Sequence, residues 1–259
     1  MIDLHMHILP HLDDGARDLE EAVEMARMLV ADGVTTVAAT PHDPASDMVY
    51  GYSIDKVLHR LDYLRRALKA LDIPLQVLTG TELYADFELL YRLSAGDVLS
   101  YNDSQTVLVE FPTRTPLETI QDTVSDLLRE DYRMVLAHPE RLKIVQDNAN
   151  VLLPLIERGI VMQLTAGALT GDQGERMQKR AEELVAHRLV HTLASDAHGI
   201  YTRPPGLAKA RTRVAELIGE TAAREMVYDV PMALLHDEYI ALPEPQPVAR
   251  SLLARIFQA

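Results

Sequence analysis

Seven short apolar runs, separated by longer segments with helical spacing, constrain the fold of this chain more than any other feature. The runs are residues 2–4, 35–39, 75–78, 106–109, 133–137, 160–164 and 191–194. Each is short and mostly apolar or β-branched, as expected for strands buried on both faces. Strands that alternate with helices form largely parallel sheets. Seven such repeats in 259 residues therefore predict an α/β fold, and they suit a single barrel better than an open sheet.

The segments between the runs carry recognisable helix signals. Apolar residues recur at helical spacing over residues 19–30, and Gly33 suits the position just past a helix end. A second helix is expected over residues 53–71, and a third opens at Leu117 after Pro116. Two further helices are expected over residues 173–187 and 206–217.

The composition allows one large domain. With 47% hydrophobic residues, the chain has enough apolar material for one large core. We expect the barrel to occupy residues 1–241. Residues 242–259 form a tail with three prolines, followed by an apolar stretch with two arginines at 250–257. This tail is expected to be a surface appendage or a packing arm.

Charge and residue usage exclude several classes of function. The net charge is −14, with 39 acidic against 25 basic residues, which argues against nucleic acid as a partner because that binding relies on Lys and Arg. A local pocket can still be positive where divalent cations are bound. Cysteine is absent, which excludes disulfides, thiolate zinc sites and a cysteine nucleophile. No run approaches the roughly 18 apolar residues of a membrane span, and no secretory signal opens the chain, so we expect a cytoplasmic protein without membrane insertion.

Two histidines at the end of the first run give the strongest local signal for a metal. His5 and His7 stand two residues apart on an extended segment, so their side chains point to one side and can bind one ion together. Taken alone, the pair is equally compatible with two polar residues where a strand leaves the core.

Residues able to bind a metal recur at the same end of six of the seven runs. In a parallel barrel these ends meet at one rim, where such folds place their active sites. Of the adjacent Asp13 and Asp14 we favour Asp14. The nine candidate ligands are His5, His7, Asp14, His42, Glu82, Glu110, His138, Asp196 and His198. Nine ligands imply two or three ions, and mixed imidazole and carboxylate donors suit Mn, Fe or Zn rather than Ca.

A cluster of divalent ions indicates hydrolysis, because it produces a nucleophile from water at neutral pH and neutralises developing charge. Arg141, three residues after His138, offers a planar, permanently charged group that matches phosphate oxygens. The alternative is that Arg141 is a surface residue that pairs with Glu140 or Asp147. Arg203 could reach the same rim, but a surface role is at least as compatible with its position. The remaining histidines are interpreted as structural: His11, His59, His187, His191 and His236.

Several motifs together resemble a known family. The chain resembles the polymerase-and-histidinol-phosphatase (PHP) superfamily, and within it the bacterial manganese-dependent tyrosine-protein phosphatases of the CpsB/YwqE type, over residues 1 to about 240. The resemblance implies a distorted (β/α)7 barrel with three metal ions. The motifs that carry it are Asp3-Leu4-His5-Met6-His7, Asp13-Asp14-Gly15, Thr40-Pro41-His42, Val109-Glu110-Phe111-Pro112, Ala137-His138-Pro139-Glu140-Arg141 and Ser195-Asp196-Ala197-His198.

The resemblance also implies roles for individual residues. One ion would be held by His5, His7, Glu82 and Asp196; Glu82 would bridge to a second ion held by Glu110 and His138; Asp14, His42 and His198 would hold the third. Arg141 would bind the phosphoryl group, assisted by Arg203. The implied substrate is protein phosphotyrosine on a bacterial tyrosine autokinase that regulates capsule or exopolysaccharide synthesis.

The sequence departs from the family pattern at one position, and two other functions are compatible with it. Relatives usually have a second histidine where this chain has Asp43, which would either add negative charge near the phosphate or replace a hydrogen-bond partner. A small-molecule phosphatase of the histidinol-phosphate type would share the barrel and the ions. A non-catalytic metal-binding module is the second alternative, although intact candidates at all nine positions argue against a decayed site.

Overall fold

Parallel strands in two sheets form the centre of the molecule. The computed structural model describes residues 1–49 and 52–249. The three-stranded sheet has the order β1-β2-β3, and the five-stranded sheet has the order β4-β5-β6-β7-β8. The strands are β1 (Ile2–Met6), β2 (Thr36–Ala39), β3 (Gln76–Thr79), β4 (Glu82–Tyr84), β5 (Thr106–Glu110), β6 (Arg133–Ala137), β7 (Val161–Thr165) and β8 (Thr192–Ala194). Each of the seven predicted runs is found as a strand, and every pairing is parallel.

The short strand β4 was not predicted. The chain leaves β3, which pairs with β2, and enters β4, which pairs with β5, after only Gly80 and Thr81. A Cβ at Gly80 would lie 2.9 Å from Cγ2 of Thr40, so the close approach of the two segments favours glycine. Glu82 is therefore the first residue of a strand, and not a loop residue after the third strand.

The two sheets meet at two places. Isolated parallel bridges join His42 to Glu82 and Met6 to Ala197. At the second bridge, the backbone N–H of Asp196 donates to the carbonyl of His5 at 2.9 Å. Both contacts lie beside predicted ligands, so the backbone pairing between the sheets also brings these side chains together.

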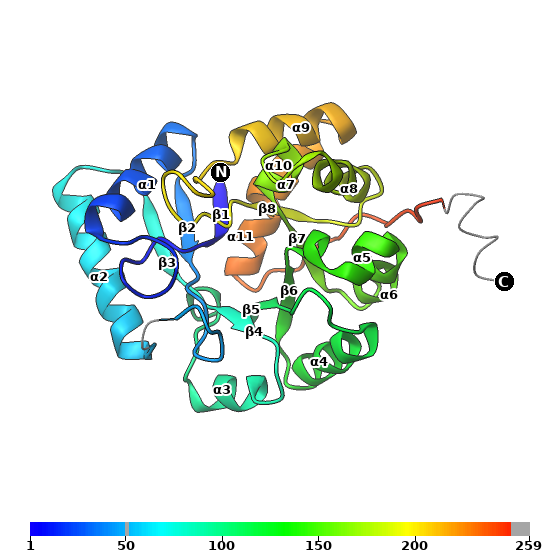
Figure 1. Ribbon diagram of the computed structural model, residues 1–259, viewed down its shortest axis with the longest axis horizontal. Coiled ribbons are helices and arrows are strands. Elements are labelled where there is room, and N and C mark those ends of the chain that lie inside the picture. The colour runs from blue at the N-terminus through cyan, green and yellow to red at the C-terminus, as the bar shows by residue number, and fades with distance from the viewer. Residues whose placement is uncertain (50–51, 250–259) are drawn as a thin grey trace.

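Helices lie outside the strands, with α1 and α2 beside the three-stranded sheet (Figure 1). The five predicted helices are present with small shifts of their ends. Asp18 and Ser53 cap α1 and α2 by accepting hydrogen bonds from backbone N–H groups in the first turn. The helices are α1 (Leu19–Ala31), α2 (Ile54–Ala70), α3 (Leu89–Ala95), α4 (Leu117–Arg129), α5 (Lys143–Asp147), α6 (Leu153–Ile156), α7 (Ala166–Thr170), α8 (Glu175–Ala186), α9 (Ala208–Ile218), α10 (Glu220–Arg224) and α11 (Val230–Leu235).

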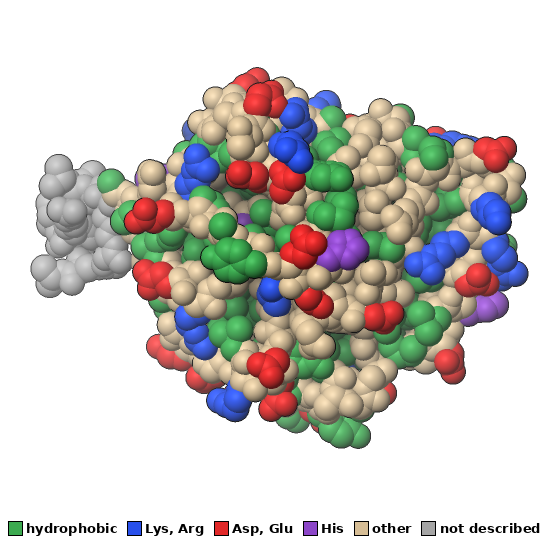
Figure 2. Space-filling view, turned by 180° about the vertical axis from the view of Figure 1, so that it is seen from behind, with side chains coloured by type: hydrophobic (Ala, Val, Ile, Leu, Met, Phe, Trp, Pro, Cys, Tyr) green, Lys and Arg blue, Asp and Glu red, His purple; other side chains and the backbone are tan. Residues whose placement is uncertain are grey.

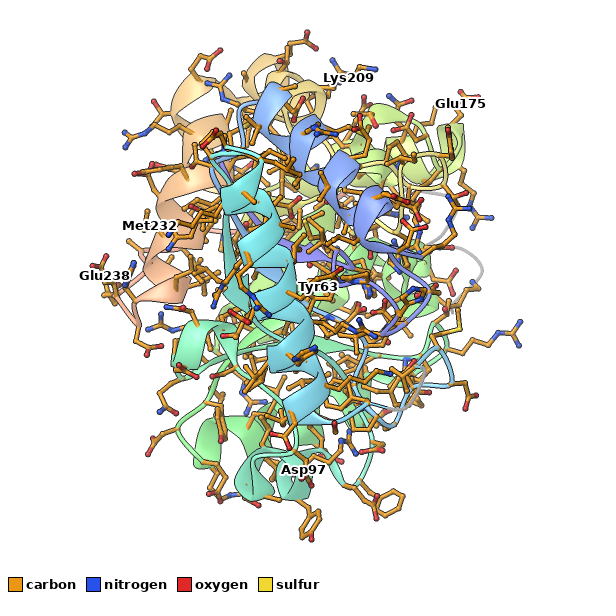
Figure 3. All side chains as sticks on the ribbon, turned by 90° about the vertical axis from the view of Figure 1, so that its left-hand side faces the viewer. Tyr63, Asp97, Glu175, Lys209, Met232 and Glu238 are labelled. Carbon is orange, nitrogen blue, oxygen red and sulfur yellow. The ribbon has the colours of Figure 1, made fainter. Side chains whose placement is uncertain are left out.

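Amphipathic helices enclose the larger part of the core. Helix α2 buries Val57, Leu61, Leu64 and Leu68 at helical spacing, whereas Tyr63 lies on its outward side (Figure 3). This periodicity is what places α2 against the sheet with its polar side toward solvent.

A second, smaller apolar cluster lies on the other face of the strands and supports the site. It includes Leu108 of β5 and Val161 of β7. Because side chains two residues apart in a strand share a face, Glu110 and Gln163 follow these residues on the same side. The polar site is therefore built directly next to a layer of packed apolar side chains.

The described part of the tail packs against the rest of the chain. The backbone N–H of Val248 donates to Oδ1 of Asn150 at 2.7 Å, and Nδ2 of Asn150 donates back to the Val248 carbonyl at 2.9 Å. The apolar stretch predicted at residues 250–257 lies outside the described residues. Within the described ranges, no helix has both the length and the apolar character needed to cross a membrane. On the face shown in Figure 2, acidic and basic side chains are interspersed.

Candidate metal centre

The structure brings all nine predicted metal ligands together. Their side-chain nitrogen and oxygen atoms fall into four overlapping groups, within each of which the atoms lie within 4.8 Å of one another. The groups are His7, Asp14, His42 and His198; His5, His7 and Asp196; His5, Glu82 and His138; and His42, Glu82 and Glu110. Glu82, His5, His7 and His42 each belong to two groups, so the cluster is continuous.

The donor atoms are oriented as metal ligands would be. His5 Nε2, His7 Nε2, His42 Nδ1 and His198 Nε2 are buried and have no hydrogen-bond partner within residues 1–49 and 52–249. Buried polar atoms normally have such a partner, so four unpaired imidazole nitrogens facing a group of carboxylates fit divalent cations. Neutral imidazole and ionised carboxylate are also the forms that bind metal.

Two carboxylates in the cluster are held ionised. Burial favours the neutral acid of Glu82 and of Asp196, but the charge of His5 and the further charges and hydrogen bonds around them together outweigh burial, and the pKa of each lies well below its usual range. The imidazole of His138 adds a hydrogen bond to Glu82 at 2.8 Å. Glu82 therefore carries its negative charge at the centre of the cluster.

Unusual backbone conformations aim several ligands into the site. His138 directly follows β6, Asp196 lies two residues after the end of β8, and their φ angles are 33° and 51°. Positive φ in a residue other than glycine costs of order 1–3 kcal/mol and is found at functional sites. A Cβ at Gly15 would lie 2.1 Å from the carbonyl oxygen of His7, so only glycine lets the loop that carries Asp14 lie against β1.

Side chains behind His5 of β1 and His7 just after it orient the two imidazole rings. Oδ2 of Asp13 lies 2.7 Å from Nδ1 of His7, and Oε1 of Gln163 lies 2.8 Å from Nδ1 of His5. Such contacts select the tautomer that leaves Nε2 free to bind metal. Asp14 instead lies 3.4 Å from Nε2 of His42 and 3.3 Å from Nε2 of His198. The two adjacent aspartates thus have different positions, and Asp14, the favoured candidate, is the one among the ligands.

Three supporting residues were missed by the sequence analysis. Asp13 was set aside in favour of Asp14, and Gln163 was read only as part of a strand. Asp3 accepts backbone hydrogen bonds from Ser195 at 3.1 Å and from His5 at 3.3 Å. Burial raises the pKa of Asp3 to about 6, although these hydrogen bonds oppose the shift. The sequence carries a signal for both residues, because Asp3 and Gln163 are the polar residues of the otherwise apolar runs 2–4 and 160–164.

Both predicted arginines lie at the cluster. A guanidinium nitrogen of Arg141 contacts Oδ2 of Asp196, and Nη1 of Arg203 lies 3.0 Å from the same oxygen. Among the ion pairs of the described residues, Arg141 pairs with Asp196 and with neither Glu140 nor Asp147, and Asp147 pairs with Lys143. The side chains of Arg141 and Arg203 remain 29% and 34% exposed, so they can also contact a molecule from solvent.

The charge of Asp43 is compensated by an arginine and by backbone N–H groups. Its side chain is fully buried and accepts from Arg92 at 2.9 Å and from the backbone N–H groups of Tyr84 and Ala45 at 2.9 and 2.7 Å. Burial raises the pKa of Asp43 although Arg92 opposes the shift. The residue therefore ties the loop after His42 to β4 and α3.

The remaining histidines are in none of the four groups, and His11 is exposed. His59 is within α2, and His187 and His236 follow the ends of α8 and α11. His191 is buried, and its Nδ1 accepts from the backbone N–H of Met162 at 3.0 Å.

Comparison with known proteins agrees with this geometry. The tyrosine-protein phosphatase YwqE of Bacillus subtilis is 35% identical over 257 residues, which cover 99% of this chain and all of that protein. The tyrosine-protein phosphatase CpsB of Streptococcus pneumoniae is 28% identical and covers 93% of the chain. A crystal structure from a study of YwqE and CpsB, described as unique metal-dependent tyrosine phosphatases, superimposes with a TM-score of 0.90 at 36% identity, over 96% of this chain and all of that one.

The match to a protein family covers most of the chain. Residues 1–236 match the family described as "Capsular polysaccharide synthesis, CpsB/CapC". This range contains all nine clustered ligands and both arginines. The chain with this His and carboxylate centre therefore belongs to the CpsB/CapC family.

Proposed function

We propose that this protein is a metal-dependent phosphomonoesterase that hydrolyses phosphotyrosine in proteins. The observation that carries the proposal is the convergence of nine candidate ligand side chains, four of which present buried imidazole nitrogens that have no hydrogen-bond partner in the described part of the chain. Membership of the CpsB/CapC family and the likeness to metal-dependent tyrosine phosphatases support the same activity. The substrate we propose is a phosphotyrosine segment of a bacterial tyrosine autokinase that controls capsule or exopolysaccharide synthesis.

The ligands are proposed to hold three divalent ions, with Mn²⁺ the favoured metal. His5, His7 and Asp196 would hold one ion, with Glu82 bridging to a second ion that also uses Glu110 and His138. Asp14, His42 and His198 would hold the third. Oε1 of Glu82 lies 3.1 Å from Nε2 of His5 and 2.8 Å from Nε2 of His138, which are proposed for different ions, and this supports Glu82 as their shared ligand. When bound, the ions supply a nucleophile derived from water at neutral pH and neutralise developing negative charge.

Arg141 and Arg203 are proposed to bind the phosphoryl group. Their guanidinium groups both reach one carboxylate oxygen of Asp196, and a planar guanidinium can bind two phosphate oxygens at once. Because the ions provide the nucleophile, no side chain needs to form a covalent intermediate, which suits a chain without cysteine.

The fold proposed for this activity is a single distorted (β/α)7 barrel over residues 1–241, with residues 242–259 as a tail. The bridges between the two sheets at His42 and Met6 support closure of the barrel. Only Gly80 and Thr81 separate β3 from β4, so the two can be counted as one interrupted strand. The eight strands then correspond to seven strand positions of the proposed barrel.

The test is hydrolysis of p-nitrophenyl phosphate and of a phosphotyrosine peptide by protein reconstituted with Mn²⁺. We expect turnover of both and higher kcat/KM on the peptide than on histidinol phosphate. No turnover of either aryl phosphate, in protein that retains metal by elemental analysis, would refute the proposed activity. A preference for histidinol phosphate would instead identify a small-molecule phosphatase.

A further inference from the structure

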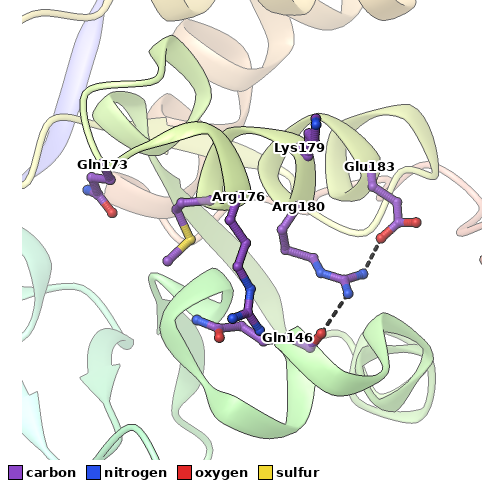
Figure 4. Close-up of a pocket in the computed structure, with 7 residues that line it drawn as sticks. Gln146, Gln173, Arg176, Lys179, Arg180 and Glu183 are labelled. Atoms are coloured by element: carbon purple, nitrogen blue, oxygen red, sulfur yellow. Dashed lines mark hydrogen bonds and ion pairs between the residues drawn. The ribbon is translucent and has the colours of Figure 1, made fainter.

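A basic pocket lies between α5 and α8. Its volume is about 400 Å³, and Figure 4 shows the side chains around it. They provide three cations and one carboxylate in a chain whose net charge is −14. The lining residues are Gln146, Gln173, Arg176, Met177, Lys179, Arg180 and Glu183.

The two arginines of this pocket have different environments. Nη2 of Arg180 donates to the Gln146 carbonyl at 2.6 Å, and its Nη1 pairs with Glu183 (Figure 4). Arg180 therefore joins α8 to α5 and forms a fixed wall. Arg176 is exposed and, among the described residues, makes no ion pair or side-chain hydrogen bond; it extends toward Gln146 in Figure 4. Its charge is available to a molecule from solvent.

The pocket is connected to the arginine proposed to bind phosphate. Nε2 of Gln146 donates to the carbonyl of Glu140 at 3.3 Å, and Glu140 directly precedes Arg141. The short helix α5 begins two residues after Arg141. The pocket is therefore joined to Arg141 through Gln146 and the start of α5.

The positive charge of the pocket favours an acidic peptide segment. A phosphotyrosine carries about −1.5 to −2 charges at pH 7, and acidic neighbours increase the repulsion from a strongly acidic protein. A local group of cations beside the site attracts an acidic substrate segment that the rest of the protein repels, and it orients that segment as it approaches. Lys179 can contribute, because its pair with Glu175 is largely exposed and therefore weak.

We propose that the pocket between α5 and α8 binds acidic side chains that flank the phosphotyrosine of the substrate. This inference rests on the proposed phosphatase function. It assigns Arg176 as a specificity-determining residue outside the metal centre. The occupant is an extended acidic peptide segment, with Arg176 and Lys179 contacting its carboxylates.

The test compares two phosphotyrosine peptides that differ only in having Glu or Gln at the flanking positions. With the Mn²⁺-loaded full chain, we expect a lower KM for the Glu peptide and similar kcat for both. Arg176→Glu should raise the KM for the Glu peptide about five- to tenfold, as expected for about 1–1.4 kcal/mol of lost attraction and added repulsion. Arg176→Gln should give a smaller change in the same direction.

The matched control is Arg66→Glu, which makes the same charge change on α2, on the opposite side of the molecule in Figure 1. This variant should keep the ratio of KM values between the two peptides. An unchanged ratio in Arg176→Glu, or an equal change in Arg66→Glu, would overturn the pocket assignment while leaving the phosphatase activity intact. Absence of turnover on either peptide and on p-nitrophenyl phosphate in the unmodified protein would instead refute the proposed function.

Discussion

Replacing Asp13 by Asn should weaken metal binding although Asp13 is not among the clustered ligands. Asp13 is 4% exposed, and its Oδ2 lies 2.7 Å from Nδ1 of His7. The amide has nearly the same shape but removes the negative charge that makes this hydrogen bond strong. Loss of such a partner behind a ligating histidine costs about 10- to 100-fold in metal affinity, which is about 1.4 to 2.7 kcal/mol.

The assay is a Mn²⁺ titration of chelator-stripped protein, followed by hydrolysis of p-nitrophenyl phosphate and by elemental analysis after dialysis. The midpoint for Asp13→Asn should rise about 10- to 100-fold, while activity at saturating metal returns close to that of the unmodified protein. The control is Asp14→Asn, which alters a proposed ligand and should not recover at saturating metal. A titration curve for Asp13→Asn that coincides with that of the unmodified protein would refute the role of Asp13 in orienting His7.

Three further predictions concern the centre and the core. Glu82→Ala should abolish turnover and reduce metal content, because it removes the oxygen shared between ions; retained metal with near-normal turnover would contradict this. Arg141→Ala should lower kcat/KM for p-nitrophenyl phosphate by about 10²–10³ with unchanged metal content, and loss of metal would indicate a structural role instead. Burial lowers the pKa of His191 to about 4, so the folded state favours the neutral ring and the unfolded state takes up the proton first. This contribution to the free energy of unfolding is complete above about pH 6.5 and is lost as the pH falls toward 4, by at most about 3 kcal/mol. Urea unfolding across this pH range should show a steeper loss of stability with falling pH in the unmodified protein than in His191→Asn. Equal pH dependence of stability in the two proteins would contradict the assignment.

Much of the strand order and the ligand set could be predicted from the linear pattern. Short apolar runs alternating with helical periods imply parallel strands, and parallel strands bring their carboxyl ends to one side. His42, His138 and Asp196 each follow a predicted strand, and the structure brings them into one cluster. Strand β4 was missed because three residues that begin with a glutamate carry too little apolar pattern to be recognised.

The surroundings of the ligands depended on tertiary structure. Gln163 reaches His5 across 158 residues of sequence, and Asp3 accepts from Ser195 across 192 residues. In the described part of the chain, Arg141 pairs with Asp196, 55 residues away, and not with Glu140 or Asp147. Local alternation of apolar and polar residues specifies which face of a strand is buried, and this is a property of the sequence alone. The identity of a hydrogen-bond partner depends on which strands become neighbours in space, and only the folded arrangement of the two sheets determines that.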